Sequence, residues 1–479
     1  MSSNGPQERA PLPFSTIFFY AFPAVPISAM GLPLVVHLPP FYAGPMGLGL
    51  TLVGTIFMLA RFWDVFTDPI IGILSDKYET RWGRRRHWIV ASVPIMLISV
   101  VMVFMPMSDA VTGGYLIFWL FFLYVGWTLL TISHMSWGAE LTPDYHERTR
   151  VQSAREVCLI LGMVFVLMLP AIIEAMHPEN VAAARIASMG WFVLILLPIA
   201  VFLAVWKVPE HKTPRPQHVP FRQAVAVLVG NLPLRRVLIA DLVLGISGGT
   251  IASLFLFVAE DSLQLGKFAS LGLLLYFISG VAFVPVVLRV SRMVGKHRAA
   301  ALSSLFNTIT VPIILLIPAG SIPYAAGVMI LLGLNMAASP FLFRSMMADV
   351  ADQDAVDTGQ RRTGLFFAML AMTNKFGAAI AIGLSYMMLD MVGFVPGGEN
   401  SQAALDGLRA VYVWPTFFIG FIVAYVVWNF PLDEARQKIN RAILEERERH
   451  ISTLDVAAAA IETRTLTPSD PQSTGAAAD

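Results

Sequence analysis

Residues 50–75 read LTLVGTIFMLARFWDVFTDPIIGILS and are followed at 76–86 by DKYETRWGRRR. The first stretch is apolar over more than the roughly 20 residues that an α-helix needs to cross a bilayer. The second stretch is charged and holds five lysine or arginine residues. A long apolar run that ends in a basic loop is typical of a transmembrane helix whose loop stays in the cytoplasm.

The rest of the chain repeats this pattern. Hydrophobic residues make up 56% of the 479 residues and charged residues 14%, whereas a typical soluble domain has about 25% charged residues. Twelve apolar runs follow one another, at 14–38, 46–75, 88–107, 114–138, 154–175, 187–207, 236–258, 268–290, 299–318, 322–346, 363–391 and 408–431. A transmembrane β-barrel would instead show alternating segments of about ten residues. We therefore expect an all-α membrane protein with twelve transmembrane helices, which excludes a soluble enzyme, a nucleic-acid binder and a disordered protein.

Lysine and arginine are shared unevenly between the loops. They cluster after the even-numbered runs, while the opposite loops hold only Arg185, Lys267 and Arg409. Because basic loops stay in the cytoplasm, both termini are expected there. The polar residues 1–13 have no cleavable-signal pattern, so the first run is expected to be retained. The single cysteine, Cys158, excludes an internal disulfide and lies in an apolar run, where it is expected to pack.

The chain divides into two similar parts. A Pro-rich, polar linker at 208–235 separates residues 14–207 from residues 236–431, and the hydrophilic tail 432–479 begins with a helix-like charged segment and ends in a stretch expected to be disordered. The basic loop after the second run matches one after the eighth, and the loop after the fourth matches one after the tenth. A weak internal repeat in a multi-span protein indicates a transporter whose site lies between the repeats. We expect two pseudo-symmetric six-helix bundles.

The second run carries charges inside the membrane. Such charges cost about 2.5–3.5 kcal/mol each on insertion scales and are expected to have a partner and a function. Arg61, Asp64 and Asp68 lie on one helix face, with Thr67 beside them. Two carboxylates one turn apart repel unless a cation or a shared proton relieves them, and carboxylate and hydroxyl oxygens suit a small hard cation. The pattern favours a coupling-ion site; the alternative is a network that fixes the second span to its neighbours.

Further polar side chains lie in the fourth, fifth and eleventh runs. Thr128 and Thr131 share a helix face and could complete an oxygen shell, although membrane threonines also bond their own helix carbonyls. His134 could bind a ligand, relay protons or simply pack. Arg155 could hydrogen-bond to ligand hydroxyls or to a ligand carboxylate. Alternatively, its side chain could extend (snorkel) to the cytoplasmic membrane surface. Lys375 lies too deep to snorkel, so it is expected to face an acid or a cavity.

The charged residues of the cytoplasmic loops are expected to have a structural role and not to bind substrate. Their acids and bases can form ion pairs between helix ends, which would hold one conformation closed at the inner face. The residues expected to form these gating pairs are Asp76, Arg84, Arg85, Arg148, Asp349, Asp352 and Arg361.

Three separated motifs carry a family resemblance. They are RFWDVFTDPIIGILSDKYETRWGRRRHWI at 61–89, GAELTPDYHERTR at 138–150 and ADVADQDAVDTGQRRTGLFFAMLAMTNK at 348–375. These stretches resemble the glycoside–pentoside–hexuronide:cation symporters, the melibiose-permease branch of the major facilitator superfamily. The resemblance implies the major facilitator fold and alternating access around a site at the membrane midplane.

The resemblance also implies roles for particular residues. Asp64 and Asp68 match the two acids of the family's cation site, Thr67 stands where an amide is usual, and Thr128 matches a further ligand. A family arginine that contacts sugar matches Arg155, and a lysine near the site matches Lys375. Thr131 and His134 complete the set of expected substrate-binding residues.

The chain differs from the melibiose-type permeases at two positions that affect which substrate is expected. The first span has no acid, and Thr131 stands where melibiose-type permeases carry a second sugar-binding acid. The substrate is therefore expected to be acidic or less hydroxylated, such as a uronide, a sulfonated sugar or a glycoside with an aglycone, with Arg155 and Lys375 as countercharges.

The leading hypothesis is a symporter in a bacterial inner membrane that imports a sugar or glycoside with sodium or a proton. It would work as a monomer in the lipid bilayer, without a cofactor or nucleic acid. A lysolipid carrier of the same fold is the alternative. A membrane enzyme is disfavoured, because no HExxH motif, nucleophile elbow or P-loop is found.

Overall fold

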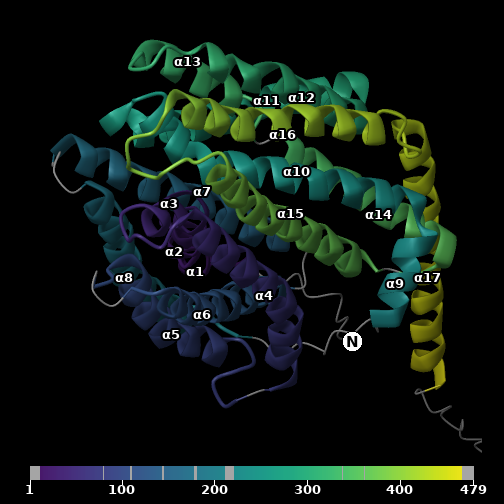
Figure 1. Cartoon of the computed structure of the whole chain (residues 1–479). Helices are drawn as coiled ribbons and strands as arrows, with labels where there is room; N and C mark the ends of the chain where they lie inside the picture. Colours follow the sequence, from purple (N-terminus) through teal and green to yellow (C-terminus); the bar gives the residue numbers. More distant parts are fainter. Residues whose placement is uncertain are drawn as a thin grey trace, which may run out of the picture.

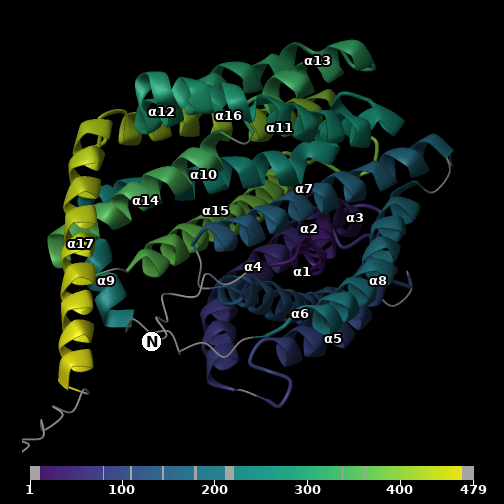
Figure 2. The ribbon, with the colours of Figure 1, turned by 180° about the vertical axis from the view of Figure 1, so that it is seen from behind.

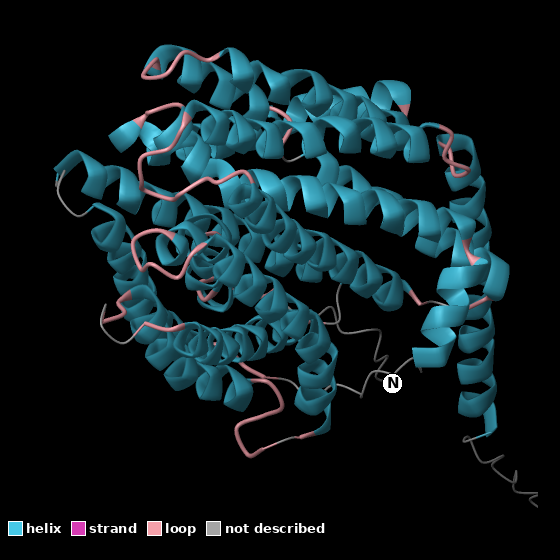
Figure 3. Cartoon of the chain, in the orientation of Figure 1, coloured by secondary structure: helices cyan, strands magenta, loops and turns pink. Residues whose placement is uncertain are grey.

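The computed structural model describes residues 11–78, 80–107, 111–142, 145–176, 181–210, 221–336, 338–360 and 362–465. Within these ranges the chain is built from helices and short connections (Figure 3). Twelve helical segments of the described chain are long and apolar enough to cross a membrane, which confirms the expected number of spans.

The first six spans form one half of the molecule. The first span combines α1 (Phe14–Ala21), α2 (Ala24–Gly31), η1 (Pro33–His37) and α3 (Leu38–Ala43). The others are α4 (Leu50–Lys77), α5 (Arg86–Phe104), α6 (Gly113–Glu140), α7 (Tyr145–Met176) and α8 (Val181–Lys207).

The other six spans form the second half. They are α10 (Leu232–Phe257) with η3 (Val258–Ser262), α11 (Ala269–Val294), α12 (Lys296–Thr310) with η5 (Val311–Leu316), α13 (Ile322–Gly333) with α14 (Ala338–Thr358), α15 (Thr363–Met391) and α16 (Gln402–Trp428). Figures 1 and 2 show the two halves side by side, with α4 and α7 of the first half against α15 and α11 of the second.

The first span is broken at its prolines. Proline lacks a backbone N–H, so each one removes a helical hydrogen bond. Pro23 precedes α2, and Pro33 begins a π-helical turn that ends at His37. Pro39 and Pro40 then lie in the short α3. The span therefore changes helical form twice between its two ends.

The segment assigned to the linker is partly helical. It contains α9 (Phe221–Gly230), and α10 already begins at Leu232, while residues 211–220 lie outside the described ranges.

The charged tail forms α17 (Glu434–Thr465), which stands across the ends of the other helices in Figures 1 and 2. The buried Asn440 amide donates to Gln353 of α14 at 2.9 Å, and Arg447 donates to the Ala355 carbonyl at 3.2 Å. α17 is therefore fixed to the second half.

The two halves touch directly at the end of the molecule away from α17. The Thr51 hydroxyl of α4 donates to Asp390 of α15 at 2.5 Å, and Arg185 of α8 pairs with Glu260 of η3 at 2.7 Å. A Cβ on Gly54 would collide with Tyr386, so α4 and α15 approach closely here. We call this the closed end, and we call the end with α17 and the Arg84–Arg86 loop the basic end.

Within the second half, α10 and α15 pack through small residues, which allow close backbone approach between membrane helices. A Cβ placed on Gly249 would lie 2.7 Å from the Cβ of Ala381, whereas one on Gly248 would meet nothing within 4 Å. A Cβ on Gly377 would collide with the Leu242 carbonyl. The α10–α15 pair thus behaves as one packed unit.

This packing gives a matched pair of variants. Gly249→Leu should destabilise the protein by about 1–3 kcal/mol through overpacking, whereas Gly248→Leu on the same helix should have little effect. Thermal unfolding of the detergent-solubilised protein measures the difference. Equal losses for both variants would contradict the described contact.

Candidate functional site

An ion cluster joins the two halves inside the membrane. Lys375 Nζ of α15 lies 2.7 Å from Asp64 Oδ2 and 2.5 Å from Asp68 Oδ2, both on α4. The Thr128 hydroxyl of α6 donates to the other oxygen of Asp64, Oδ1, at 2.8 Å. Asp64 is only 1% exposed, while the Asp68 and Lys375 side chains remain 27% and 30% exposed. The sequence placed the two acids on one face, and the structure brings Lys375 and Thr128 to them.

Helical spacing explains this arrangement. Asp64 and Asp68 lie one turn apart, so both carboxylates project from the same side of α4 and a single ammonium can contact both. Pro69 follows directly inside the helix and removes the backbone bond to the Val65 carbonyl. An extra backbone acceptor is thereby left in the turn that carries the acids.

Arg61 and Tyr124 lie one helical turn before Asp64 and Thr128 on their respective helices. Both side chains are buried, and neither the Tyr124 hydroxyl nor Arg61 Nε has a hydrogen-bond partner in the described protein. Tyr124 was not predicted as a site residue, because a lone tyrosine in an apolar aromatic run gives no distinguishing signal. Arg61 adds positive charge beside the acids, which fits the interpretation of the second span as a structural network.

Thr67 does not point its hydroxyl at the acids. Its Oγ1 donates to the Asp64 carbonyl of its own helix at 3.1 Å. This is the usual behaviour of a threonine in a membrane helix, so cation binding by Thr67 stays a prediction.

His134 lies in the packed interior of the first half. Its ring is fully buried and stacks on Tyr20 with ring centroids 4.6 Å apart. Its Nε2 lies 2.7 Å from the Tyr20 carbonyl, and the Tyr20 hydroxyl donates to the His134 carbonyl at 3.1 Å. The geometry supports packing of the fourth span against the first. The Nδ1 of His134 is buried without a hydrogen-bond partner in the described protein, so substrate binding by His134 stays a prediction.

Arg155 and Thr131 do not contact the ion cluster through any described hydrogen bond or ion pair. The Arg155 side chain is 8% exposed and pairs with Glu156 at 3.2 Å. Its Nε and the Thr131 hydroxyl are buried, and neither has a hydrogen-bond partner in the described protein. Buried donors without partners are rare in proteins, so both remain candidates for contact with a polar ligand.

At the basic end, ion pairs and hydrogen bonds connect the helix ends of the first half to one another. Arg84 and Arg85 each contact Glu140 at 2.7 Å, and Glu210 accepts the backbone N–H groups of both arginines at 2.6 Å. Glu210 lies in the segment assigned to the linker and was not predicted. Arg148 is exposed and donates to the Thr142 carbonyl at 3.3 Å.

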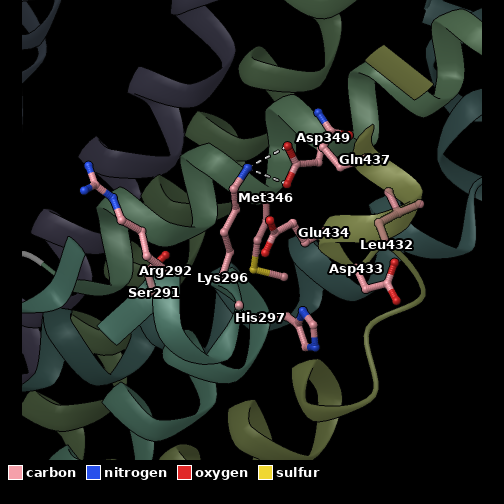
Figure 4. Close-up of a pocket in the computed structure, with 11 residues that line it drawn as sticks. Ser291, Arg292, Lys296, His297, Met346, Asp349, Leu432, Asp433, Glu434 and Gln437 are labelled. Atoms are coloured by element: carbon pink, nitrogen blue, oxygen red, sulfur yellow. Dashed lines mark hydrogen bonds and ion pairs between the residues drawn. The ribbon is translucent and has the colours of Figure 1, made fainter. Parts of the chain in front are cut away.

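The second half has its own pairs at the same end. Lys296 contacts both oxygens of Asp349 at 2.7 Å, beside a cavity of about 320 Å³ at the start of α17 (Figure 4). Asp352 accepts from Gln437 of α17 at 2.9 Å, and Arg362 pairs with Asp354 at 2.7 Å.

Each ion pair described at the basic end joins residues of one half. In this conformation these pairs brace each half separately, and the expected gating across the inner face stays a prediction. Arg361 and the side chain of Asp76 lie outside the described residues.

Comparisons with known proteins agree with this architecture. A family profile described as MFS/sugar transport protein matches residues 19–434. The glucuronide carrier protein homolog of Escherichia coli is 24% identical over 83% of this chain and 88% of its own. The isoprimeverose transporter of Lactiplantibacillus pentosus is 23% identical over 86% and 88%. A sodium-dependent lysophosphatidylcholine symporter of Danio rerio is 23% identical over 87% and 84%.

Solved structures show the same fold at low identity. The nucleoside transporter NupG aligns with a TM-score of 0.63 at 12% identity, over 87% of this chain and 99% of that one. A D-xylose-proton symporter aligns with a TM-score of 0.65 at 15% identity, over 88% and 98%. These matches confirm the major facilitator fold that the sequence motifs imply.

The family match covers both halves and the ion cluster between them. It also confirms the resemblance to the cation symporters drawn from the three motifs. The chain therefore belongs to the family of MFS/sugar transport proteins and is a multi-pass membrane transporter, not an enzyme.

Proposed function

We propose that the protein is a cation-coupled symporter that carries a sugar or glycoside by alternating access. The observation that carries this proposal is the contact of one ammonium, Lys375, with two carboxylates of the opposite half, Asp64 and Asp68. The acids of the proposed ion site are thus held by a group of the protein itself.

A coupling cation would compete with Lys375 for the same oxygens. Sodium or a proton at Asp64 and Asp68 satisfies the carboxylates and weakens the contact that links α4 to α15. The released ammonium can then bind a polar substrate, because a lysine inside the membrane needs a new partner. Ion and substrate would therefore favour the same rearrangement of the two halves, which is the requirement for symport.

The closed end supports alternating access. Thr51–Asp390 and Arg185–Glu260 join the halves at that end, whereas the ion pairs described at the basic end stay within each half. With the basic end in the cytoplasm, as the positive charges indicate, this conformation is closed to the outside. A bacterial inner membrane and a monomeric state belong to the same proposal, as the resemblance of the sequence motifs to the cation symporters implies.

The charges near the site favour an acidic sugar or a glycoside. Arg155 and Lys375 supply positive charge, and Thr131 replaces a family acid that binds sugar hydroxyls. Relatives named as a glucuronide carrier homolog and an isoprimeverose transporter support a sugar substrate. The lysophosphatidylcholine symporters among the relatives make a lysolipid the competing substrate class.

Counterflow in proteoliposomes tests the function. Labelled neutral glycosides, uronides, sulfonated sugars and lysophosphatidylcholine should be compared, with a sodium or a proton gradient varied independently. Exchange of a sugar that one cation enhances is the expected result. Exchange of lysophosphatidylcholine alone would overturn the sugar assignment and leave the symporter fold intact.

The acid pair gives a prediction about ion coupling. Asp64→Asn should abolish gradient-driven accumulation and keep some facilitated exchange, because the ion site loses a charge while Asp68 still holds Lys375. Uptake assays with and without the cation gradient measure both activities. Asp406→Asn, an exposed acid at the closed end, is the matched control; full concentrative uptake by Asp64→Asn would refute the ion site.

The lysine gives a prediction about competition with the cation. If Lys375 competes with the cation, Lys375→Gln should lower the half-saturating cation concentration about tenfold, equivalent to roughly 1.4 kcal/mol. The cation dependence of ligand binding to purified protein measures this constant. Lys438→Gln, which removes an exposed lysine paired with Glu434 on α17, should leave it unchanged. A higher half-saturating concentration in Lys375→Gln would contradict competition.

A further inference from the structure

A second acid lies inside the membrane, in the other half of the protein. Asp241 belongs to α10, in the apolar sequence VLIADLVLG at 237–245, and is 6% exposed. It was not predicted as a site residue, because it has no acidic or basic neighbour at helical spacing within its run. Its burial nevertheless resembles that of Asp64, at 1% exposed.

The surroundings of the two acids differ. Asp64 contacts an ammonium, whereas no lysine or arginine lies within ion-pair distance of Asp241 among the described residues. The hydrogen bond described for its carboxyl group joins Oδ2 to the Thr373 hydroxyl of α15 at 3.0 Å. The same hydroxyl lies 2.9 Å from the Leu370 carbonyl, so its one hydrogen serves one of these two acceptors at a time.

The charged group that faces Asp241 from further away is Arg344 of α14, whose side chain is exposed. α16 also packs against α10, but its described polar contact is a hydroxyl pair, Ser247 to Thr416 at 3.2 Å, which carries no charge. The short helices η1, α3 and α9 contribute no charged group that acts on Asp241 among the described residues. The carboxylate is therefore enclosed by helices that leave it without a counterion at contact distance.

A buried carboxylate without a counterion is costly when it is ionised, and the usual relief is to bind a proton. We infer that Asp241 is a second ion-coupling site of this transporter and that it holds a proton in the conformation described. The proton comes from water, and an acid protonated on Oδ2 can donate it to the Thr373 hydroxyl oxygen, whose own hydrogen then bonds the Leu370 carbonyl at 2.9 Å. Asp64 and Asp68, which share Lys375, can remain ionised in the same state.

The position of Asp241 connects this proton to the first site. Thr373 lies two residues before Lys375 on α15, and α10 and α15 are packed through Gly245, Gly249 and Gly377. Asp241 and Lys375 thus move as parts of one unit. A shift of α14 that brings Arg344 to the carboxylate would favour its ionised form and release the proton. Asp241 lies in the second half, whereas Asp64 and Asp68 lie in the first. The role of Asp241 in transport depends on the proposed symport.

Infrared spectroscopy of the protein in lipid vesicles tests the proton directly and needs no substrate. A protonated carboxylic acid absorbs at higher frequency than a carboxylate. Wild-type protein titrated with pH should show a protonated-acid band that Asp241→Asn lacks and Asp406→Asn keeps. A band unchanged in Asp241→Asn would overturn the inference.

Two further variants separate proton binding from a structural role. Thr373→Val removes the hydrogen-bond partner of the carboxyl group, and Arg344→Gln removes the facing positive charge. Arg344 stabilises the ionised form in the wild type, so Arg344→Gln should shift the midpoint of the band to higher pH, and Thr373→Val should displace the midpoint because the acid loses its hydrogen-bond partner at Oδ2. If the midpoint of the band stays in place in Thr373→Val and in Arg344→Gln, Asp241 only fixes α10 to α15. The midpoint can be measured in these two variants even if Asp241→Asn fails to fold.

Counterflow then separates this inference from the proposed function. Asp241→Asn mimics the protonated acid, so exchange should persist and lose the dependence on pH that the wild type shows. If exchange keeps the wild-type pH dependence, coupling through Asp241 is refuted even where the infrared band is present. Failure of every substrate in the panel, with the band intact, would count against the proposed sugar transport alone.

Discussion

An ammonium shared by two carboxylates inside the membrane is the interaction on which the rest of the structure depends. Each of these charges alone would be costly in a low-dielectric interior, and their mutual contact relieves that cost together with the Thr128 hydroxyl, which donates to Asp64. The acids are on α4 and the lysine is on α15, so the contact requires the two halves to lie against each other at this depth. The electrostatic requirement of three side chains thereby sets the relative position of two six-helix bundles.

The other polar contacts follow a simple division. Among the described residues, the hydrogen bonds and ion pairs between the halves occur at the ion cluster and at the closed end, through Thr51–Asp390 and Arg185–Glu260. The ion pairs described at the basic end hold the helices of one half together, as Arg85–Glu140 and Lys296–Asp349 do. If the protein works by the proposed alternating access, few described polar contacts would have to break when the halves move relative to each other.

Much of the fold was predictable from the sequence, because apolar runs of sufficient length report directly on membrane helices. The twelve spans, the break in the first span and the placement of Asp64 and Asp68 on one face all follow from local spacing. The family motifs also marked Lys375 and Thr128. Contacts between side chains far apart in the chain could not be predicted in this way. His134 is a plausible ligand in isolation, yet its ring packs on Tyr20, which lies 114 positions away. Asp241 and Glu210 gave no local signal, because their importance depends on which helix packs beside them.

The docking of α17 has a practical consequence for observing the transporter at work. Because Asn440 and Arg447 fix this helix to α14, a fluorophore on α17 reports the position of the second half as a whole. Paired with a second dye on the loop between α4 and α5, it provides a distance that changes only when the halves move relative to each other. The single native cysteine, Cys158, is buried, so labelling chemistry directed at introduced surface thiols has little background. The α17 helix is thus a ready attachment point for single-molecule recording of the transport cycle.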